Sequence, residues 1–390
     1  MPGYEMIGEE EKQALVDVFD KFGGVLIRNG NIPRRNGSFK VTEFEKAVAG
    51  RMGSKYGHAV TSGTAALKTG LVALGVKEGD EVITQCFTFV ATVEAIVELG
   101  AIPVITEIDK TLNMDPIDLE KKISKKTKAI MPVHMYGSAA RMDQINQIAK
   151  KHGIPVMEDA AQAFGATYKG KCVGTLGDAG ALSFDFGKGI TTGEGGMVLT
   201  DVEDLYKRSK EYSDHGHEDN PAFSRGEDSC RLMGFNYKMM ELQGALGLAQ
   251  LKKFDKALKL QKGNKARIIE GISKISNIEL REFADKEGET GDSLVFFLDN
   301  VERTKKFVKL MAEKGLPTKN LPDAYKWHFA GFWHQIFSRF ERYGNKGWEK
   351  AWAKSDALLT RAVSMPINIY MADEQINKYI SGINEIAAKV

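Results

Sequence analysis

The chain has 390 residues, of which 43% are hydrophobic, and a chain of this size forms a sizeable core with more than one hydrophobic unit. The net charge is only +2 with 27% charged residues, so no global field recruits nucleic acid or a membrane, and we expect small-molecule partners. Three cysteines without metal-site spacing, and no apolar stretch of membrane-spanning length, favour a cytoplasmic protein without disulfides.

A basic, glycine-rich segment comes first along the chain, and it contains Arg28, Arg34 and Arg35. Guanidinium groups bind carboxylates and phosphates in a fixed fork, so these arginines are candidate contacts for an acidic substrate. A solvated loop is the competing interpretation. Farther along, His215 and His217 are further candidate substrate contacts. As metal ligands they lack a third well-spaced partner, so we expect no metal site.

The sequence Ser62-Gly63-Thr64 follows an apolar pair and precedes a helical pattern, which is typical of a helix N-terminus. Free backbone N–H groups and the helix dipole attract an anion there, and Gly63 lets a phosphate approach the main chain. Such a sequence is more often only a helix cap. Downstream, Phe87 and Phe89 are either ordinary core residues or provide an aromatic ring that lies flat on a pyridine ring.

Short apolar runs alternate with helical patterns in the next part of the chain. The predicted strands and helices are, in order, 81–84, 92–99, 102–105, 118–123 and 129–133. This alternation predicts an α/β fold with a mainly parallel sheet and helices on both faces.

A short apolar run that begins at Val156 ends in Asp159 and is followed by Gln162. Catalytic side chains lie at the carboxyl ends of strands in such sheets. Pyridoxal phosphate acts as an electron sink only while its ring nitrogen is protonated, and a carboxylate against that nitrogen keeps it so. Asp159 is the candidate for this role, although a single acid at a strand end is more often a cap or a salt-bridge partner.

Lys188 lies five residues after Ser183, in a glycine-rich turn between two apolar runs. A lysine amine forms a Schiff base with a cofactor aldehyde, and desolvation lowers its pKa so that the reactive neutral form is populated. Ser183 is placed to donate a hydrogen bond to a phosphate. The alternative, a Walker-type phosphate loop, fails because Gly189 replaces the required Ser or Thr and Leu182 replaces the first glycine.

Long helical patterns dominate from residue 204 onward, and the longest covers 239–274. Two strands and two helices are expected after it, at 278–283, 293–298, 303–314 and 373–389. We therefore predict a large cofactor-binding domain with an N-terminal arm over residues 1–255, and a smaller C-terminal α+β domain over 256–390.

A series of motifs connects these segments: SGTAAL, FTFVAT, PVHMYG, EDAAQAFGA, SFDFGK, TTGEGG and GFNYKM occur in that order. In this order the sequence resembles the DegT/DnrJ/StrS family of pyridoxal-phosphate-dependent sugar aminotransferases over most of its length. One motif can arise by chance, but this series does not. The resemblance implies the aspartate aminotransferase-like fold, known as fold type I.

The resemblance also implies roles for single residues. Lys188 would carry the cofactor as a Schiff base, and Asp159 would pair with the pyridinium nitrogen. The other implied cofactor contacts are Gln162 near the phenolic oxygen, Phe89 on the ring, and Gly63, Thr64 and Ser183 at the phosphate. Asn236 matches a position that reaches the phosphate of the neighbouring subunit, which implies a homodimer with shared active sites. The family's dehydratase branch has histidine at the lysine position, so Lys188 favours amino transfer over elimination.

The two segments with candidate substrate contacts, together with Trp327, His328 and the 354–356 segment, are similar to one branch of the family. That branch aminates the terminal carbon of an eight-carbon keto-sugar acid, with L-glutamate as donor and 2-oxoglutarate as coproduct. The product is 8-amino-3,8-dideoxy-manno-octulosonate, which implies a role in lipopolysaccharide or other surface polysaccharide synthesis. The rival substrate is a nucleotide-linked keto-sugar.

Two further classes of protein were weighed. A regulatory protein that keeps the fold without turnover is disfavoured because Lys188, Asp159, Gln162 and Ser183 are all present, with no fused DNA-binding segment. A nicotinamide dehydrogenase is disfavoured because no Gly-x-Gly-x-x-Gly follows an early strand.

Overall fold

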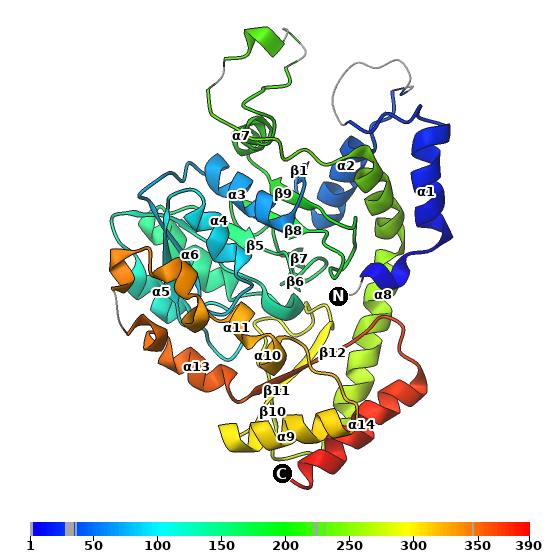
Figure 1. Ribbon diagram of the computed structural model, residues 1–390, viewed down its shortest axis with the longest axis vertical. Coiled ribbons are helices and arrows are strands. Elements are labelled where there is room, and N and C mark those ends of the chain that lie inside the picture. The colour runs from blue at the N-terminus through cyan, green and yellow to red at the C-terminus, as the bar shows by residue number, and fades with distance from the viewer. Residues whose placement is uncertain are drawn as a thin grey trace.

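A computed structural model describes residues 3–27, 35, 37–220, 222, 225–229, 231–344 and 347–390 (Figure 1). The N-terminal part forms a 3-10 turn at Gly3–Met6 and the helices α1 (Glu9–Asp20) and α2 (Lys40–Met52). Both helices pack on α8 (Glu241–Ile272), the long helix that runs along one side of the molecule (Figure 1). Arg28, Arg34 and Cys230 lie outside the described residues.

The large sheet is mainly parallel, as predicted. Its strands are β1 (Tyr56–Val60), β2 (Glu81–Gln85), β3 (Ile102–Thr106), β4 (Thr127–Ile130), β5 (Met157–Asp159), β8 (Ala179–Ser183) and β9 (Gly196–Thr200). They form two hydrogen-bonded groups, β3-β2-β4 and β5-β8-β9-β1, which are joined by parallel bridges from Ile130 to Val156 and from Val133 to Asp159. Only β9 among these strands runs antiparallel to its neighbours.

Helices cover both faces of this sheet. Neighbouring residues of each strand point to opposite sides, and apolar side chains on both sides pack against helices. Ile83 and Leu182 belong to a core cluster with residues of α2 and of α6 (Met142–His152). Val82 and Ala181 belong to a second cluster with α3 (Gly63–Ala73) and α4 (Ala91–Val97). The remaining elements of this part are α5 (Pro116–Lys122), α7 (Glu203–Ser213) and a hairpin of β6 (Thr167–Tyr168) and β7 (Lys171–Cys172).

A smaller antiparallel sheet follows, with β10 (Glu279–Leu280), β11 (Ser293–Phe297) and β12 (Ala362–Pro366) in that order. The helices α9 (Val301–Glu313) and α14 (Asp373–Ala387) share a core with the C-terminal end of α8. The predicted strand at 278–283 is only two residues long, and the sequence prediction missed β12. Since α8 continues through residue 255 without a break, the proposed domain boundary falls inside a helix.

The segment between the small sheet's β11 and β12 returns to the large sheet. It contains α10 (Asn320–Asp323), α11 (Tyr325–His328), α12 (His334–Phe337) and α13 (Ala353–Leu359), in orange in Figure 1. Trp352 Nε1 donates to Ile105 O at 3.1 Å, so this segment covers the edge strand β3. Thr88 N donates to His328 O at 2.9 Å, which places α11 beside the loop after β2. Among the described helices, none is long and apolar enough to cross a membrane.

Candidate active site

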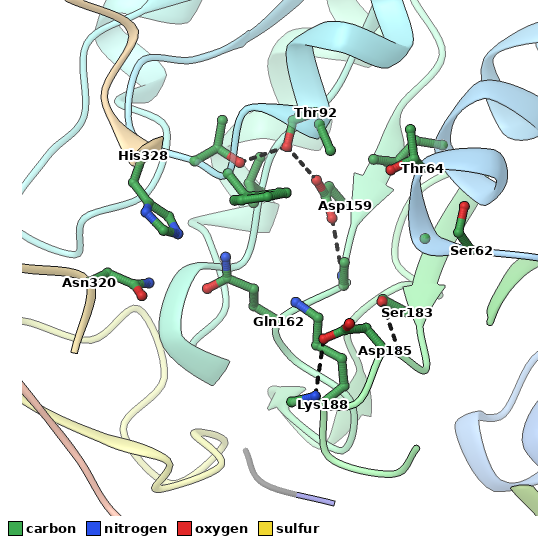
Figure 2. A pocket seen from close by; sticks show the side chains of 18 of the residues that line it. Ser62, Thr64, Thr92, Asp159, Gln162, Ser183, Asp185, Lys188, Asn320 and His328 are labelled. Carbon is green, nitrogen blue, oxygen red and sulfur yellow. Dashed lines mark hydrogen bonds between the residues drawn. The ribbon is translucent and has the colours of Figure 1, made fainter. Parts of the chain in front are cut away.

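A cavity of about 470 Å³ lies where several strands of the large sheet end (Figure 2). Gly63 begins α3 just after β1, and Asp159 ends β5. Phe89 and Lys188 lie in the loops after β2 and β8. The carboxyl ends of parallel strands meet at one edge of a sheet, which is why segments far apart in the sequence converge here. The convergence brings together the predicted cofactor residues Gly63, Thr64, Phe89, Asp159, Gln162, Ser183 and Lys188.

The first turn of α3 forms one end of the cavity. Ser62 caps this helix, since its Oγ accepts a hydrogen bond from Ala65 N at 3.1 Å. A Cβ atom added to Gly63 would lie 2.8 Å from Ser183 Cβ, so only glycine lets Ser183 approach the start of the helix this closely. The free N–H groups, the helix dipole and the Ser183 hydroxyl together suit an anion such as a phosphate.

Asp159 is the last residue of β5 and is buried. Its Oδ2 accepts from Thr92 Oγ1 at 2.7 Å, and its Oδ1 accepts from Ala161 N at 3.1 Å. Burial raises the pKa of this carboxyl, while the two hydrogen bonds and the charge of Lys188 oppose the increase. Neutral donors orient the carboxylate without neutralising it, so the site suits a cationic group such as a protonated ring nitrogen.

Lys188 lies in the loop after β8, and its backbone N donates to Asp185 O at 3.0 Å. Burial lowers the pKa of its amine, and Asp185 and Asp159 oppose this shift. The neutral form of the amine, which is the nucleophile, is therefore more populated in Lys188 than in an exposed lysine. Figure 2 shows the side chain of Lys188 near Gln162 and Asp159, between the two ends of the cavity.

Phe89 provides an aromatic surface in the cavity, and its side chain is 44% exposed in a region where its neighbour Phe87 is fully buried. Its ring centroid lies 5.6 Å from that of His328. An exposed phenyl ring of this kind is suited to stacking on a flat heteroaromatic ring. Gln162 Oε1 accepts from Tyr136 N at 3.5 Å, which holds its amide at the cavity.

The opposite end of the cavity is formed by Asp292, Lys319, Asn320 and His328, and we call it the C-terminal wall. Lys319 Nζ lies 2.8 Å from Asp292 Oδ2 and 2.7 Å from Ser293 Oγ. His328 Nδ1 lies 2.9 Å from Ala324 O, which only accepts, so Nδ1 carries the proton and Nε2 of the neutral ring is an acceptor. Burial lowers the pKa of His328, and the charges of Lys188 and Lys319 lower it further.

The sequence analysis missed most of this wall. His328 was noted only as part of a similarity to one branch, and Lys319, Asn320 and Asp292 carried no local signal. Lysines and asparagines are common on surfaces, and Asp292 lies at the end of a polar loop. Lys319, Asn320 and His328 reach the cavity because the chain returns from the small sheet to the large one. Asp292 reaches it from the position just before β11.

Comparison with known proteins gives the family. The model of the DegT/DnrJ/EryC1/StrS aminotransferase family matches residues 26–384. The chain belongs to this family. A GDP-perosamine synthase from Caulobacter vibrioides is 44% identical over 219 residues, which are 56% of this chain and 58% of that protein. The chain thus matches less than two thirds of that relative's length.

Solved structures extend the likeness over nearly the whole chain. The aminotransferase from Psychrobacter cryohalolentis has a TM-score of 0.85 at 26% identity, and the match covers 98% of each chain. NtdA from Bacillus subtilis, solved with bound cofactor PMP, has a TM-score of 0.84 at 26% identity, over 99% of this chain and 84% of NtdA. The predicted family and the aspartate aminotransferase-like fold are confirmed.

Several residues predicted for the active site do not line the cavity of the single chain. Asn236, in the segment before α8, forms an isolated antiparallel β-bridge with Asp214. Its role toward a neighbouring subunit stays a prediction. Arg35 is almost fully buried, with its guanidinium 4.7 Å from the centroid of the Phe39 ring. His217 Nδ1 lies 2.6 Å from Asp228 Oδ2, which accounts for one side of its ring.

His215 is exposed, with a φ of 57° in the loop after α7. Arg28 and Arg34 lie outside the described residues, so the structure says nothing about their proposed contact with substrate. Within the described ranges, no three His, Cys, Asp or Glu side chains form a group that could hold a metal ion. Cys86 is buried and Cys172 is partly buried, and both are free thiols.

Proposed function

We propose that this protein is a pyridoxal-phosphate-dependent aminotransferase that moves the amino group of L-glutamate to a keto-sugar. The observation that carries the proposal is one cavity that holds a desolvated lysine, a buried carboxylate and an anion-binding helix N-terminus. The three features match the three parts of the cofactor: its aldehyde, its ring nitrogen and its phosphate. Membership of an aminotransferase family supports it.

The residues of the cavity fit the cofactor by their chemistry. The start of α3, with Thr64 and Ser183, would hold the phosphate, because Gly63 lets Ser183 approach the free N–H groups of the first helical turn. Asp159 would pair with the ring nitrogen, and Phe89 would cover the ring. When bound, pyridoxal phosphate supplies an electron sink for the electrons left behind when a proton leaves the amino-bearing carbon.

Lys188 is the group that moves protons in this proposal. Its burial lowers the pKa of the amine and so raises the share of the neutral form, which can accept a proton from a substrate carbon and return it to a neighbouring position. Asp159 stays ionised against a cationic partner, and its two hydrogen bonds hold it in place. A lysine at position 188 can bind the cofactor again after amino transfer, and the histidine of the family's dehydratase branch cannot. Lys188 therefore supports amino transfer over elimination.

We propose the aldehyde at C8 of an eight-carbon 3-deoxy sugar acid as the acceptor, in the cytoplasmic synthesis of a surface polysaccharide such as lipopolysaccharide. The similarity of the segments with the arginines and His215 to the octulosonate branch supports it. His328 belongs to the same similarity and lines the cavity. A nucleotide-linked keto-sugar is the rival, and the likeness to a GDP-perosamine synthase supports that rival. A regulatory protein without turnover is disfavoured by the complete set of catalytic side chains in one cavity.

A homodimer with shared sites is part of the proposal. Asn236 lies in a segment whose neighbours Met233, Phe235 and Met240 are exposed, with Met233 at 78%. Exposed apolar side chains in one segment are typical of a surface that another chain covers. If a second copy covers this segment, Asn236 is carried to the interface, where it can reach the partner's phosphate-binding end.

The covalent assignment is tested by borohydride reduction of the cofactor-loaded protein, followed by peptide mapping. We expect the label on Lys188 alone, because among the described residues that line the cavity the only other lysine is Lys319, and its amine is already engaged by Asp292. A label on any other lysine would refute the role of Lys188. Screening the glutamate-loaded protein against keto-sugar acids and nucleotide keto-sugars then decides the acceptor.

A further inference from the structure

The charges that line the cavity are unbalanced. Among the described lining residues the acids are Asp159, Asp185, Glu194 and Asp292, and the only lysines are Lys188 and Lys319. Under the proposed function Lys188 is committed to the cofactor. The other lysine is Lys319 in the C-terminal wall, where a ligand carboxylate would be a further partner of an ammonium group that already contacts Asp292.

Lys319 is held in a way that presents its ammonium group to the cavity. Its backbone N donates to Ser364 O of β12 at 2.8 Å, which fixes the main chain. Its Nζ contacts Asp292 Oδ2 and Ser293 Oγ, and these account for two of the three N–H donors of an ammonium. The Asp292 side chain is 3% exposed and that of Lys319 is 25% exposed, so the carboxylate lies behind the amine.

The other side chains of the wall do not compete for an anion. His328 is neutral, with Nε2 as an acceptor, because burial lowers its pKa. Asn320 is uncharged. Figure 2 shows His328 and Asn320 on the side of the cavity away from Ser62 and Thr64, so the anion-binding start of α3 is at the opposite end.

The length of each substrate indicates which carboxylate meets Lys319. In glutamate and 2-oxoglutarate, both carboxylates lie within a few bonds of the carbon that reacts. In an eight-carbon sugar acid that reacts at its last carbon, the carboxylate is at the other end of the chain. Lys319 and Lys188 line the same cavity, so under the proposed function a carboxylate a few bonds from the reacting carbon is the one placed to meet Lys319.

We propose that Lys319, oriented by Asp292 and Ser293, binds a carboxylate of the dicarboxylic amino donor and of the keto acid that it becomes. This inference rests on the proposed aminotransferase function and names the residue that selects its donor. Lys319 is thus a binding residue for the donor, and it contributes little to the carboxylate of the sugar.

The test is calorimetric titration of the cofactor-loaded protein with glutarate, a dicarboxylate that cannot react, and with its uncharged diamide. Lys319→Met should weaken glutarate binding about 10- to 100-fold, the loss expected for one hydrogen bond to a charged group. Binding of the diamide should stay weak and unchanged. Lys326→Met, which removes an exposed lysine two residues from His328, is the matched control and should bind glutarate as the parent does.

Two more variants keep the test decisive if the single change disturbs folding. Lys319→Met combined with Asp292→Asn removes the cation without leaving a buried carboxylate unpaired, and it should show the same loss. Lys319→Arg keeps the charge and should retain glutarate binding within about threefold. Stopped-flow kinetics should show a slower glutamate half-reaction in Lys319→Met, and a much smaller change in the sugar half-reaction.

Equal glutarate affinity in the parent and in the double variant would overturn the proposal. Equal losses for glutarate and the diamide would also overturn it, because they would indicate a packing effect. Failure of the aminotransferase proposal would be recognised separately, because the parent protein would then either take up no cofactor, or take it up and release no 2-oxoglutarate on addition of L-glutamate.

Discussion

The two ends of the cavity are built by different means. At the end near α3, the groups are fixed by the large sheet itself: a helix start after β1, a strand end at Asp159 and a loop after β8. The C-terminal wall depends on an ion pair between Lys319 and Asp292 and on a segment that returns from the small sheet. The first kind of construction is local to the sheet edge, and the second depends on contacts between segments far apart in the sequence.

The two buried acids show the same contrast in their electrostatics. Asp159 has only neutral donors, and burial raises its pKa. Burial acts on Asp292 in the same sense, but Lys319 and other nearby cations outweigh it and hold the pKa of Asp292 well below its usual range. Asp159 therefore suits a cationic ligand as its partner, whereas Asp292 is already paired with Lys319.

The largest effect is expected at Lys188, between the two ends. Lys188→Ala should lower turnover by at least about 10³-fold, since the proton-transfer group and the covalent attachment are lost together. Steady-state kinetics and the absorbance of the lysine-bound cofactor are the measurements. Lys326→Ala, an exposed control, should leave both unchanged. Turnover retained in Lys188→Ala would exclude this lysine from the chemistry.

The next prediction compares Asp292→Asn with Asp159→Asn in the cofactor-free protein. Asp292→Asn should lower the free energy of unfolding at pH 7 by about 2–3 kcal/mol, less than for a fully buried pair because Lys319 is partly exposed. Asp159→Asn should be neutral or stabilising at pH 7, since it removes an ionised group that burial disfavours. Chemical denaturation of the two variants and the parent measures both effects.

The pH dependence of these two effects should have opposite sign. The native pKa of Asp292 is lowered, so its contribution is complete above the ordinary value of 3.8 and is lost as the pH falls below it. The native pKa of Asp159 is raised, so the parent gains stability relative to Asp159→Asn as the pH falls through that raised value toward 3.8. The same pH trend in both variants would contradict the contrast between the two ends.

Asn236 tests whether the cofactor end is completed by a second copy. Asn236→Ala should weaken cofactor binding by about 1–3 kcal/mol, the effect of one lost hydrogen bond to a charged group. Cofactor affinity and sedimentation measure it, with Met240→Ala in the same segment as a control for the interface alone. A fully active monomer would refute the shared site.

The last prediction concerns the basic segment that contains Arg28 and Arg34. Replacing Arg28 or Arg34 by Ala should raise KM for the keto-sugar acid, and the glutamate half-reaction should change little. The cost is about 1.5–3 kcal/mol in a site that excludes water and is smaller at an exposed rim. Single-turnover kinetics with the acid and its carboxyl-reduced analogue measure it. Equal reactivity of the acid and its reduced analogue would show that the sugar carboxylate does not contribute to binding.

Much of the fold was predictable because its signals are local. Apolar runs alternating with helical patterns predicted β2, β3 and β4, and glycines marked the turns that bring Gly63 and Lys188 to the cavity. The strand β12 (Ala362–Pro366) was missed because it is only five residues long and ends in a proline, which is uncommon within strands. Its register is set by pairing with β11, which is far away in the sequence.

The C-terminal wall could not be predicted for a related reason. Lys319 and Asp292 are separated by 27 residues, and nothing in either local sequence indicates that they form an ion pair. Arg35 is a second case, since its basic segment made it a candidate contact for an acidic substrate, with a solvated loop as the alternative, and the structure buries its side chain near Phe39. Long-range packing decides both cases, and a single sequence does not reveal it.

The most direct test of the central claim is to titrate the cofactor-loaded protein with L-glutamate in the absence of any sugar. The account predicts that the cofactor absorbance changes and that one 2-oxoglutarate is released for each cofactor consumed, because glutamate alone completes the first half-reaction. An unchanged spectrum without 2-oxoglutarate, in protein whose Lys188 is labelled by borohydride, would contradict the assignment of this protein as a glutamate-dependent aminotransferase.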